Sequence, residues 1–252
     1  MIYIDELIYL VIFIMEQSDK QTKIFDDGSQ YIGDLKDDMP DGKGIYYYPN
    51  DERYEGDFKN GLRDGKGIYY YEDGNRYEGE YKKGKKEGKG IFYHQNGLKV
   101  DGEFIADTWV GKQIVYYNDK KVYEGEVDGE GNKDGKGILY YGNGDKYDGN
   151  WKKGKREGKG ILYYANGDRY EGDFKDDLIE GKGIRFLTDG DKYEGDFKDG
   201  NMDGKGIYYY ANGDWLEGVF KQNVTQSGTF HFSNGKSYDW NLLKSLRQKY
   251  SK

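Results

Sequence analysis

Aromatic residues and glycines alternate with charged residues along most of this chain, and the alternation recurs. One clear example reads Tyr-Glu-Gly-Asp-Phe over residues 54–58 and Gly-Lys-Gly-Ile-Tyr-Tyr-Tyr over residues 65–71. Successive side chains of a β-strand point to opposite faces, so each such segment predicts a strand. The first positions of the equivalent segments are Tyr31, Tyr54, Tyr77, Val100, Tyr123, Tyr147, Tyr170, Tyr193, Leu216 and Tyr238, with steps of 22 to 24 residues.

Turn-forming dipeptides stand between the predicted strands. Asp-Gly and Asn-Gly pairs such as Asp73-Gly74 and Asn166-Gly167 accept positive φ and favour tight hairpin turns. Each unit is therefore predicted to be one β-hairpin, and such units fill residues 31–237. Because a lone hairpin cannot bury its aromatic face, neighbouring hairpins must stack. The predicted fold is all-β: an elongated single-layer antiparallel sheet of about nine stacked 23-residue hairpins, in other words a solenoid or ribbon.

The period of two also sorts the side chains onto two faces. Tyr54, Gly56 and Phe58 share a face with Gly65 and Gly67, where the missing side chains let a neighbouring ring lie on the backbone. The other face receives acids and lysines from adjacent strands, which form favourable cross-strand pairs. The residues expected to define the repeat are Tyr54, Gly56, Phe58, Gly65, Gly67, Tyr77, Gly79, Tyr81, Gly88, Gly90, Tyr170, Gly172, Phe174, Gly181, Gly183, Tyr193, Gly195, Phe197, Gly204 and Gly206.

The composition of the chain excludes several classes of protein and site. The chain has 252 residues, of which 28 are Tyr and 40 are Gly, and aromatics on this scale are not typical of a disordered segment. The absence of cysteine excludes disulfides and thiolate metal sites, and two histidines offer little for imidazole chemistry. A net charge of -8 argues against nucleic acid as a partner. We expect no cofactor and no metal.

These units resemble the MORN repeat (membrane occupation and recognition nexus). The resemblance rests on Tyr-Glu-Gly-Asp-Phe followed by Gly-Lys-Gly, over residues 170–183 and again over 193–206. It implies a sheet without catalysis of its own that serves as a scaffold in cytoskeletal, ciliary or membrane-associated assemblies and often dimerises. It also implies two alternatives. One is a peripheral adaptor for phosphoinositides or other anionic phospholipids, and the other is a regulatory module of a lipid-kinase or methyltransferase system.

The two ends differ from the repeats. Residues 1–24 include nine consecutive apolar residues, Leu7 to Met15, which are too few to span a bilayer. They predict either a cover for the first sheet edge or a chain that really starts at Met15. The repeat array is assigned to residues 25–240.

Residues 241–252 predict a C-terminal amphipathic helix. Asn241 is the expected N-cap, and the expected apolar face consists of Leu242, Leu243, Leu246 and Tyr250. The segment is basic, so it either caps the end of the array, which we favour, or lies on a membrane or in a partner's groove.

Two clusters of cations are candidate sites for lipid or other anions. Their residues are Lys82, Lys83, Lys85 and Lys86 in one loop, and Lys152, Lys153, Lys155 and Arg156 in another. Anionic headgroups attract such residues by about 1 kcal/mol each. A solvated loop that keeps a sheet edge soluble is an equal alternative.

The fourth unit departs from the pattern. Val100 replaces its first Tyr, Gln113 replaces a glycine, and Trp109 stands where neighbouring units have Arg or Lys. We interpret this as tolerated drift; the alternative is a bend or a partner-binding spot around Ile105, Trp109 and Val110. Acid pairs such as Glu55 and Asp57 recur in nearly every unit, which is untypical of a catalytic pair. The sequence thus predicts a non-enzymatic, cytoplasmic scaffold for protein partners, with homodimerisation and association with cytoskeleton or membrane left open.

Overall fold

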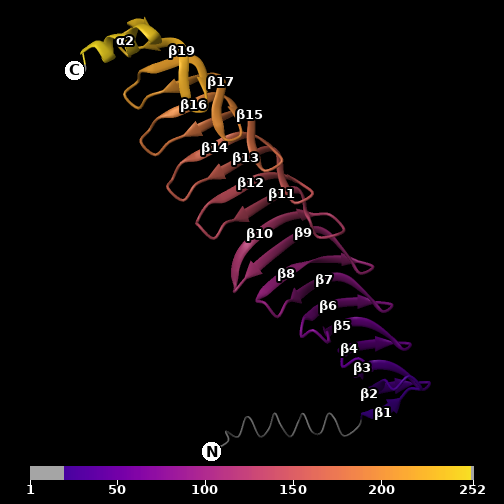
Figure 1. The fold of residues 1–252 in the computed structure, drawn as a ribbon. Helices are drawn as coiled ribbons and strands as arrows, with labels where there is room; N and C mark the ends of the chain where they lie inside the picture. Colours follow the sequence, from indigo (N-terminus) through magenta and orange to yellow (C-terminus); the bar gives the residue numbers. More distant parts are fainter. Residues whose placement is uncertain (1–19, 251–252) are drawn as a thin grey trace, which may run out of the picture. The chain divides into compact units, whose positions relative to one another are not determined.

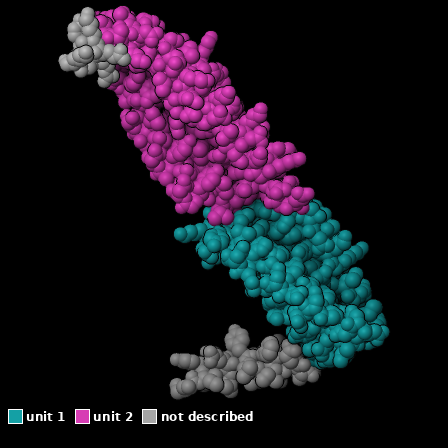
Figure 2. All heavy atoms as spheres, viewed as in Figure 1, with its two compact units in different colours: residues 1–121 teal, residues 122–252 magenta. Residues whose placement is uncertain are grey.

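The computed structural model describes residues 20–250, with side chains up to residue 246. These residues form 20 β-strands and one helix, which fall into two compact units, residues 1–121 and residues 122–252 (Figure 2). Within each unit, strands that follow one another in the sequence lie side by side and pair antiparallel (Figure 1). The predicted fold class, an antiparallel sheet of stacked hairpins followed by a short helix, is confirmed.

Unit 1 contains the first nine strands. They are β1 (Gln21–Ile24), β2 (Gln30–Lys36), β3 (Met39–Tyr47), β4 (Arg53–Lys59), β5 (Leu62–Tyr70), β6 (Arg76–Lys82), β7 (Lys85–Tyr93), β8 (Leu98–Ile105) and β9 (Thr108–Tyr117). Strand β1 pairs with β2, so four residues cover the edge of the first full hairpin. The apolar run from Leu7 to Met15 lies outside the described residues, and both of its interpretations remain predictions.

Unit 2 contains the remaining strands and the helix. They are β10 (Lys120–Val127), β11 (Lys133–Tyr140), β12 (Lys146–Lys152), β13 (Lys155–Tyr163), β14 (Arg169–Lys175), β15 (Leu178–Phe186), β16 (Lys192–Lys198), β17 (Asn201–Tyr209), β18 (Trp215–Lys221), β19 (Val224–His231), β20 (Ser237–Asp239) and α2 (Trp240–Tyr250). Strand β10 begins two residues before the boundary between the units.

Two kinds of turn connect the strands. Short turns contain two residues that both have positive φ, as at Asn60 (48°) and Gly61 (77°), the geometry of a type I′ turn. The pairs singled out in the sequence, such as Asp73-Gly74 and Asn166-Gly167, lie instead in five-residue connections such as residues 71–75. There, Gly74 has φ 77° and its N–H donates to the Tyr71 carbonyl. The prediction of tight turns at these pairs is therefore wrong in loop length. The loop of residues 71–75 is longer, and only its glycine has positive φ.

A ladder of aromatic rings forms the core of each unit. In unit 1, the rings of Tyr31 and Tyr54 both meet Phe58 edge to face, with centroids 5.0 and 5.1 Å apart. In unit 2, Tyr170 meets Phe174 and Phe197 in the same way, at 5.3 and 4.9 Å. Such pairs stabilise by about 0.5–1.5 kcal/mol beyond the burial of their area. Tyr54, for example, contacts Phe58 of its own hairpin and Tyr81 of the next, so the ladder joins one repeat to its neighbour.

The two glycines of each Gly-Lys-Gly segment have different structural roles. A Cβ on Gly67 would lie 2.2 Å from the Tyr54 hydroxyl oxygen, so this glycine makes room for the ring. Gly65 lies where the register shifts between β4 and β5, and its φ is +116°. Residues with a side chain rarely adopt this φ, so the backbone conformation requires glycine here. The register also pairs Gly56 with Gly67 and Tyr54 with Tyr69, which confirms the predicted aromatic–glycine face.

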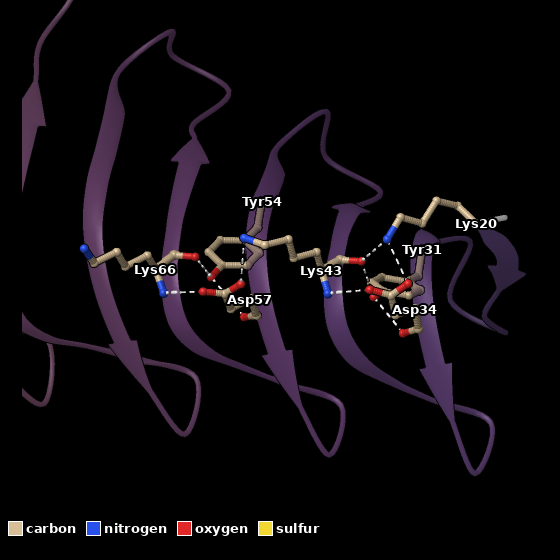
Figure 3. Close-up of polar contacts among 7 residues, drawn as sticks. All are labelled: Lys20, Tyr31, Asp34, Lys43, Tyr54, Asp57 and Lys66. Carbon is tan, nitrogen blue, oxygen red and sulfur yellow. Dashed lines mark hydrogen bonds and ion pairs between the residues drawn. The ribbon is translucent and has the colours of Figure 1, made fainter. Parts of the chain in front are cut away.

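A set of polar contacts beside the buried Tyr31 recurs beside Tyr54 (Figure 3). The Tyr54 hydroxyl donates to the Asp57 carbonyl at 3.2 Å and to the Lys66 carbonyl at 3.4 Å. The Asp57 carboxylate accepts the Lys66 N–H at 3.0 Å, and its other oxygen lies 3.2 Å from Nζ of Lys43 in the preceding hairpin. The carboxylate thus closes the bulge in its own hairpin and links it to the one before.

The helix α2 has its N-cap two residues earlier than predicted. Its N-cap is Asp239, whose Oδ1 accepts the Leu242 N–H at 3.0 Å, so the assignment of Asn241 as N-cap is wrong. Of the predicted apolar face, Leu243 is half-buried, whereas Leu242 is 50% and Leu246 is 43% exposed. The side chain of Tyr250 lies outside the described part. No helix among the described residues is both long and apolar enough to cross a membrane.

Candidate binding surface

The face opposite the aromatic core, here called the groove face, carries a ladder of alternating glutamates and isoleucines. In unit 2, the register sets Ile184 opposite Glu194, Glu194 opposite Ile207, and Ile207 opposite Glu217. The unit 1 equivalents include Glu55 opposite Ile68. Because the sequence repeats once per hairpin, each hairpin presents one carboxylate and one branched apolar side chain at equivalent positions along its strands.

A second row on the groove face consists of lysines paired with acids of the next strand. Nζ of Lys182 lies 2.6 Å from Asp196, and Nζ of Lys159 lies 2.7 Å from Asp173. The hydrogen bond from Lys182, together with the N–H of Lys205, holds the pKa of Asp196 below its usual value. These lysine side chains remain largely exposed although their ammonium groups are paired.

A third row alternates aromatic rings with cations stacked on them. The Arg53 guanidinium lies 3.9 Å from the centroid of Tyr70, and Nζ of Lys192 lies 4.2 Å from that of Tyr209. These cations also pair with the glutamates of the first row: Arg53 Nε lies 2.8 Å from Glu55, and Lys192 Nζ lies 3.3 Å from Glu194. The cations of the third row therefore fix the positions of the glutamate carboxylates in the first row.

Between the first and second rows, the floor of the groove face is the backbone of the paired glycines, whose Cβ direction points into the aromatic core. The side chains of the two rows flank this floor, so the groove face has a groove in each unit. The unit 2 groove has a volume of about 850 Å³ and runs from Lys159 to Val219, over glycines that include Gly183 and Gly206. The unit 1 groove has about 610 Å³ and runs from Lys43 to Asp101. Both are lined by the Glu–Ile ladder and by lysines.

The unit 2 groove changes character at its C-terminal end. Trp215 occupies the position where six earlier repeats have Lys or Arg, and Val219 occupies the position that Asp196 has in the preceding repeat. Trp215 stacks on His231 with centroids 4.6 Å apart and planes 7° apart. Glu217 thus lacks the cation that Lys192 supplies to Glu194, and the residue opposite Lys205 is apolar Val219. The replacements at Trp215 and Val219 can be seen in the sequence by comparing equivalent positions of the repeats, although they were not among the predicted site residues.

A family model described as "MORN repeat" matches more than half of the chain, over residues 31–53, 54–76, 77–99, 123–146, 147–169, 170–192 and 193–215. The chain belongs to the MORN repeat family. The two predicted units without a match are the fourth, whose departures were noted above, and the ninth, which contains Val219.

Solved structures are similar to this MORN chain at low identity. The TCP10 domain of Danio rerio CPAP has 15% identity, with 87% of this chain and 98% of that one covered and a TM-score of 0.46. The TCP domain of Drosophila melanogaster SAS-4, solved with a proline-rich motif of Ana2, has 14% identity, 87% and 88% coverage and a TM-score of 0.33. The G-box domain of the microcephaly protein CPAP has 11% identity, 87% and 97% coverage and a TM-score of 0.31. No curated protein matches the sequence significantly.

The two predicted cation clusters lie at short turns between MORN strands, one in each unit. Lys82, Lys83 and Lys85 are exposed beside the turn at Lys83-Gly84. Lys86 turns inward instead: its Nζ lies 4.9 Å from the ring centroid of Tyr77, and burial lowers its pKa. The structure therefore leaves three of the four predicted cations of this cluster at the surface.

The cluster in unit 2 is more strongly engaged with neighbouring acids. Lys152 pairs with Asp134 at 3.1 Å, and Lys155 pairs with Asp176 at 2.9 Å. Arg156 lies over the ring of Phe174, 5.3 Å from its centroid. Lys153 is exposed, with its backbone N–H bonded to Asp134.

In the fourth unit, Trp109 fills the space that a Tyr fills in the other MORN repeats. Its ring packs on Phe104 with centroids 3.9 Å apart, and a Cβ on Gly102 would lie 2.9 Å from it. Gln113, in place of a glycine, is buried beside it. Of the three residues predicted to bind a partner, Trp109 and Val110 are half-buried, and Ile105 is 59% exposed.

Proposed function

We propose that this protein is a non-catalytic scaffold whose groove face binds segments of partner proteins and brings them together. The observation that carries the proposal is the pair of grooves, one in each unit, lined by the same ladder of Glu, Ile and Lys. A lining that repeats at fixed spacing suits an extended ligand better than a compact substrate. The acids of the face recur from hairpin to hairpin and are held by cations, as in Arg53–Glu55 and Lys182–Asp196, which suits binding rather than proton transfer.

The test is a comparison of two double variants by affinity capture and quantitative mass spectrometry. Ile68→Lys with Ile207→Lys places one charge in each groove. Leu62→Lys with Leu178→Lys adds the same charges at exposed positions outside the groove linings. We expect the groove variant to lose partners that the wild type and the control variant both retain. Equal partner sets for all three proteins, with unchanged circular dichroism, would refute the proposal. Sedimentation of the same proteins measures homodimerisation.

A second candidate function is contact with anionic phospholipid through the unit 1 cluster. It is favoured by the three exposed cations Lys82, Lys83 and Lys85 at one turn. Replacing all three with Glu would abolish flotation with phosphoinositide-containing vesicles if these residues bind the headgroups. If the variant floats as well as the wild type, or if the wild type stays in solution, the lipid function is excluded for this cluster.

A further inference from the structure

We propose that the unit 2 groove binds a proline-rich peptide of about eight residues in the polyproline II conformation, with one peptide turn per MORN repeat. This inference rests on the proposed function, because it names the ligand of the same groove face. It is carried by three observations: the spacing of the repeats, the chemistry of the lining, and the change at the Trp215 end.

The spacing matches the period of a polyproline II helix. Equivalent residues of consecutive repeats are two strands apart, which is about 9.6 Å at the usual strand separation. A polyproline II turn has three residues and rises about 9.3 Å. Over the groove, therefore, every third peptide side chain meets an equivalent position of the protein, and the accumulated mismatch stays below about 1 Å.

Other peptide conformations lack this register. A strand repeats every two residues, or about 6.6 Å, and an α-helix turns every 5.4 Å or so. Neither period divides about 9.6 Å evenly, so their side chains would meet successive repeats in different orientations. The groove spans six strands, from Lys159 in β13 to Val219 in β18. Five strand separations amount to about 24 Å, the length of about eight polyproline II residues.

The lining supplies what such a peptide needs. The floor between the rows is backbone, including that of Gly183 and Gly206, on which a proline ring can lie, and Ile184 and Ile207 offer apolar contacts. A polyproline II backbone has no internal hydrogen bonds, so its carbonyls require donors from outside. The lysine row offers an ammonium group once per repeat; Lys182, for example, is 70% exposed although it pairs with Asp196.

The charges of the groove specify the remaining peptide positions. Glu171, Glu194 and Glu217 line the groove once per repeat, and Glu217 lacks a stacked cation because Trp215 takes that place. A basic residue at every third peptide position would therefore meet one carboxylate per repeat, most favourably at Glu217. The occupant that fits is a segment of the type Pro-Pro-Arg, repeated.

The experiment measures the affinity of the full chain for fluorescein-labelled Pro-Pro-Arg-Pro-Pro-Arg-Pro-Pro-Arg by fluorescence anisotropy. The comparison peptide, Arg-Arg-Pro-Pro-Pro-Arg-Pro-Pro-Pro, has the same composition without the period of three. We expect it to bind about ten-fold more weakly, since non-periodic arginines cannot all reach the glutamate row. Equal affinity of the two peptides would overturn the proposal, because the attraction would then depend on charge alone.

Protein variants locate the site. Ile207→Lys and Glu217→Lys should each weaken binding of the periodic peptide by about ten-fold, whereas the control Leu178→Lys should leave it unchanged. Circular dichroism and the thermal midpoint show whether each variant is folded; Glu217 is exposed, so its variant remains informative even if Ile207→Lys unfolds. If the groove variants lose cellular partners but the wild type does not bind the periodic peptide, only the polyproline II proposal fails. If those variants keep all partners, the scaffold proposal fails.

Discussion

The fit between Tyr170 and Gly183 allows a quantitative test of the core. A Cβ on Gly183 would lie 2.4 Å from both Cε2 and the hydroxyl oxygen of Tyr170, closer than side chains pack. The ring is fully buried and held edge to face by Phe174 and Phe197, and its hydroxyl donates to the Asp173 carbonyl at 3.1 Å. The ring must therefore move when Gly183 becomes Ala.

The expected cost of Gly183→Ala is about 2–4 kcal/mol. Overpacking a well-packed core costs about 1–3 kcal/mol, and loss of the hydroxyl hydrogen bond adds about 1 kcal/mol. Gly142→Ala is the matched control, because its Cβ would meet nothing within 4 Å and its φ lies outside the left-handed region. That variant should be neutral or slightly stabilising, since alanine reduces the entropy of the unfolded chain.

The assay is urea unfolding of the full chain, followed by circular dichroism, for the two single variants. A third and fourth protein, Tyr170→Leu and Tyr170→Leu with Gly183→Ala, complete a double-mutant cycle. Because leucine removes the ring that the new methyl group meets, the double variant should lose at least about 1 kcal/mol less than the sum of the single losses. The reasoning is refuted if the two losses add, or if Gly183→Ala is as stable as Gly142→Ala.

Three further predictions concern other parts of the chain. Trp109→Ala should destabilise unit 1 by about 2–4 kcal/mol, since a half-buried ring is lost from the packing on Phe104. Trp109→Phe should cost less than half as much. Equal urea midpoints for the two variants would contradict this prediction. A hydrogen bond from Lys20 holds the pKa of Asp34 below normal, and one from Lys182 does the same for Asp196. The two carboxylates therefore stabilise the folded state fully above about pH 4, the pKa of an unfolded Asp. This stabilisation disappears as the pH falls through the lower pKa values of the folded state. Urea midpoints at pH 7, 4 and 3 should therefore fall, and a constant midpoint would be inconsistent with these shifts. Asp239→Ala should reduce the helical ellipticity at 222 nm and cost about 0.5–2 kcal/mol at the end of the array, while Asp239→Asn, which keeps the capping oxygen, should retain most of the signal.

The sequence by itself determined the strands, their faces and the family. A strict period places Tyr, Gly and Phe on one face without reference to distant residues, because each hairpin pairs with its sequence neighbours and every register repeats the last. The same locality explains why the Gly56–Gly67 pairing and the Lys–acid pairs could be predicted.

The tertiary structure decided matters that depend on how hairpins meet. Two glycines that look alike in the sequence differ, since Gly67 makes room for a ring whereas Gly65 holds a left-handed bulge. Lys86 turned from a candidate surface cation into a half-buried residue, because the rings of Tyr77 in its own hairpin and of Phe104 in the next lie near its ammonium group. The groove itself has no signal in a single repeat. Its floor lies between rows of side chains that form only when several hairpins stack, so its length and lining follow from packing.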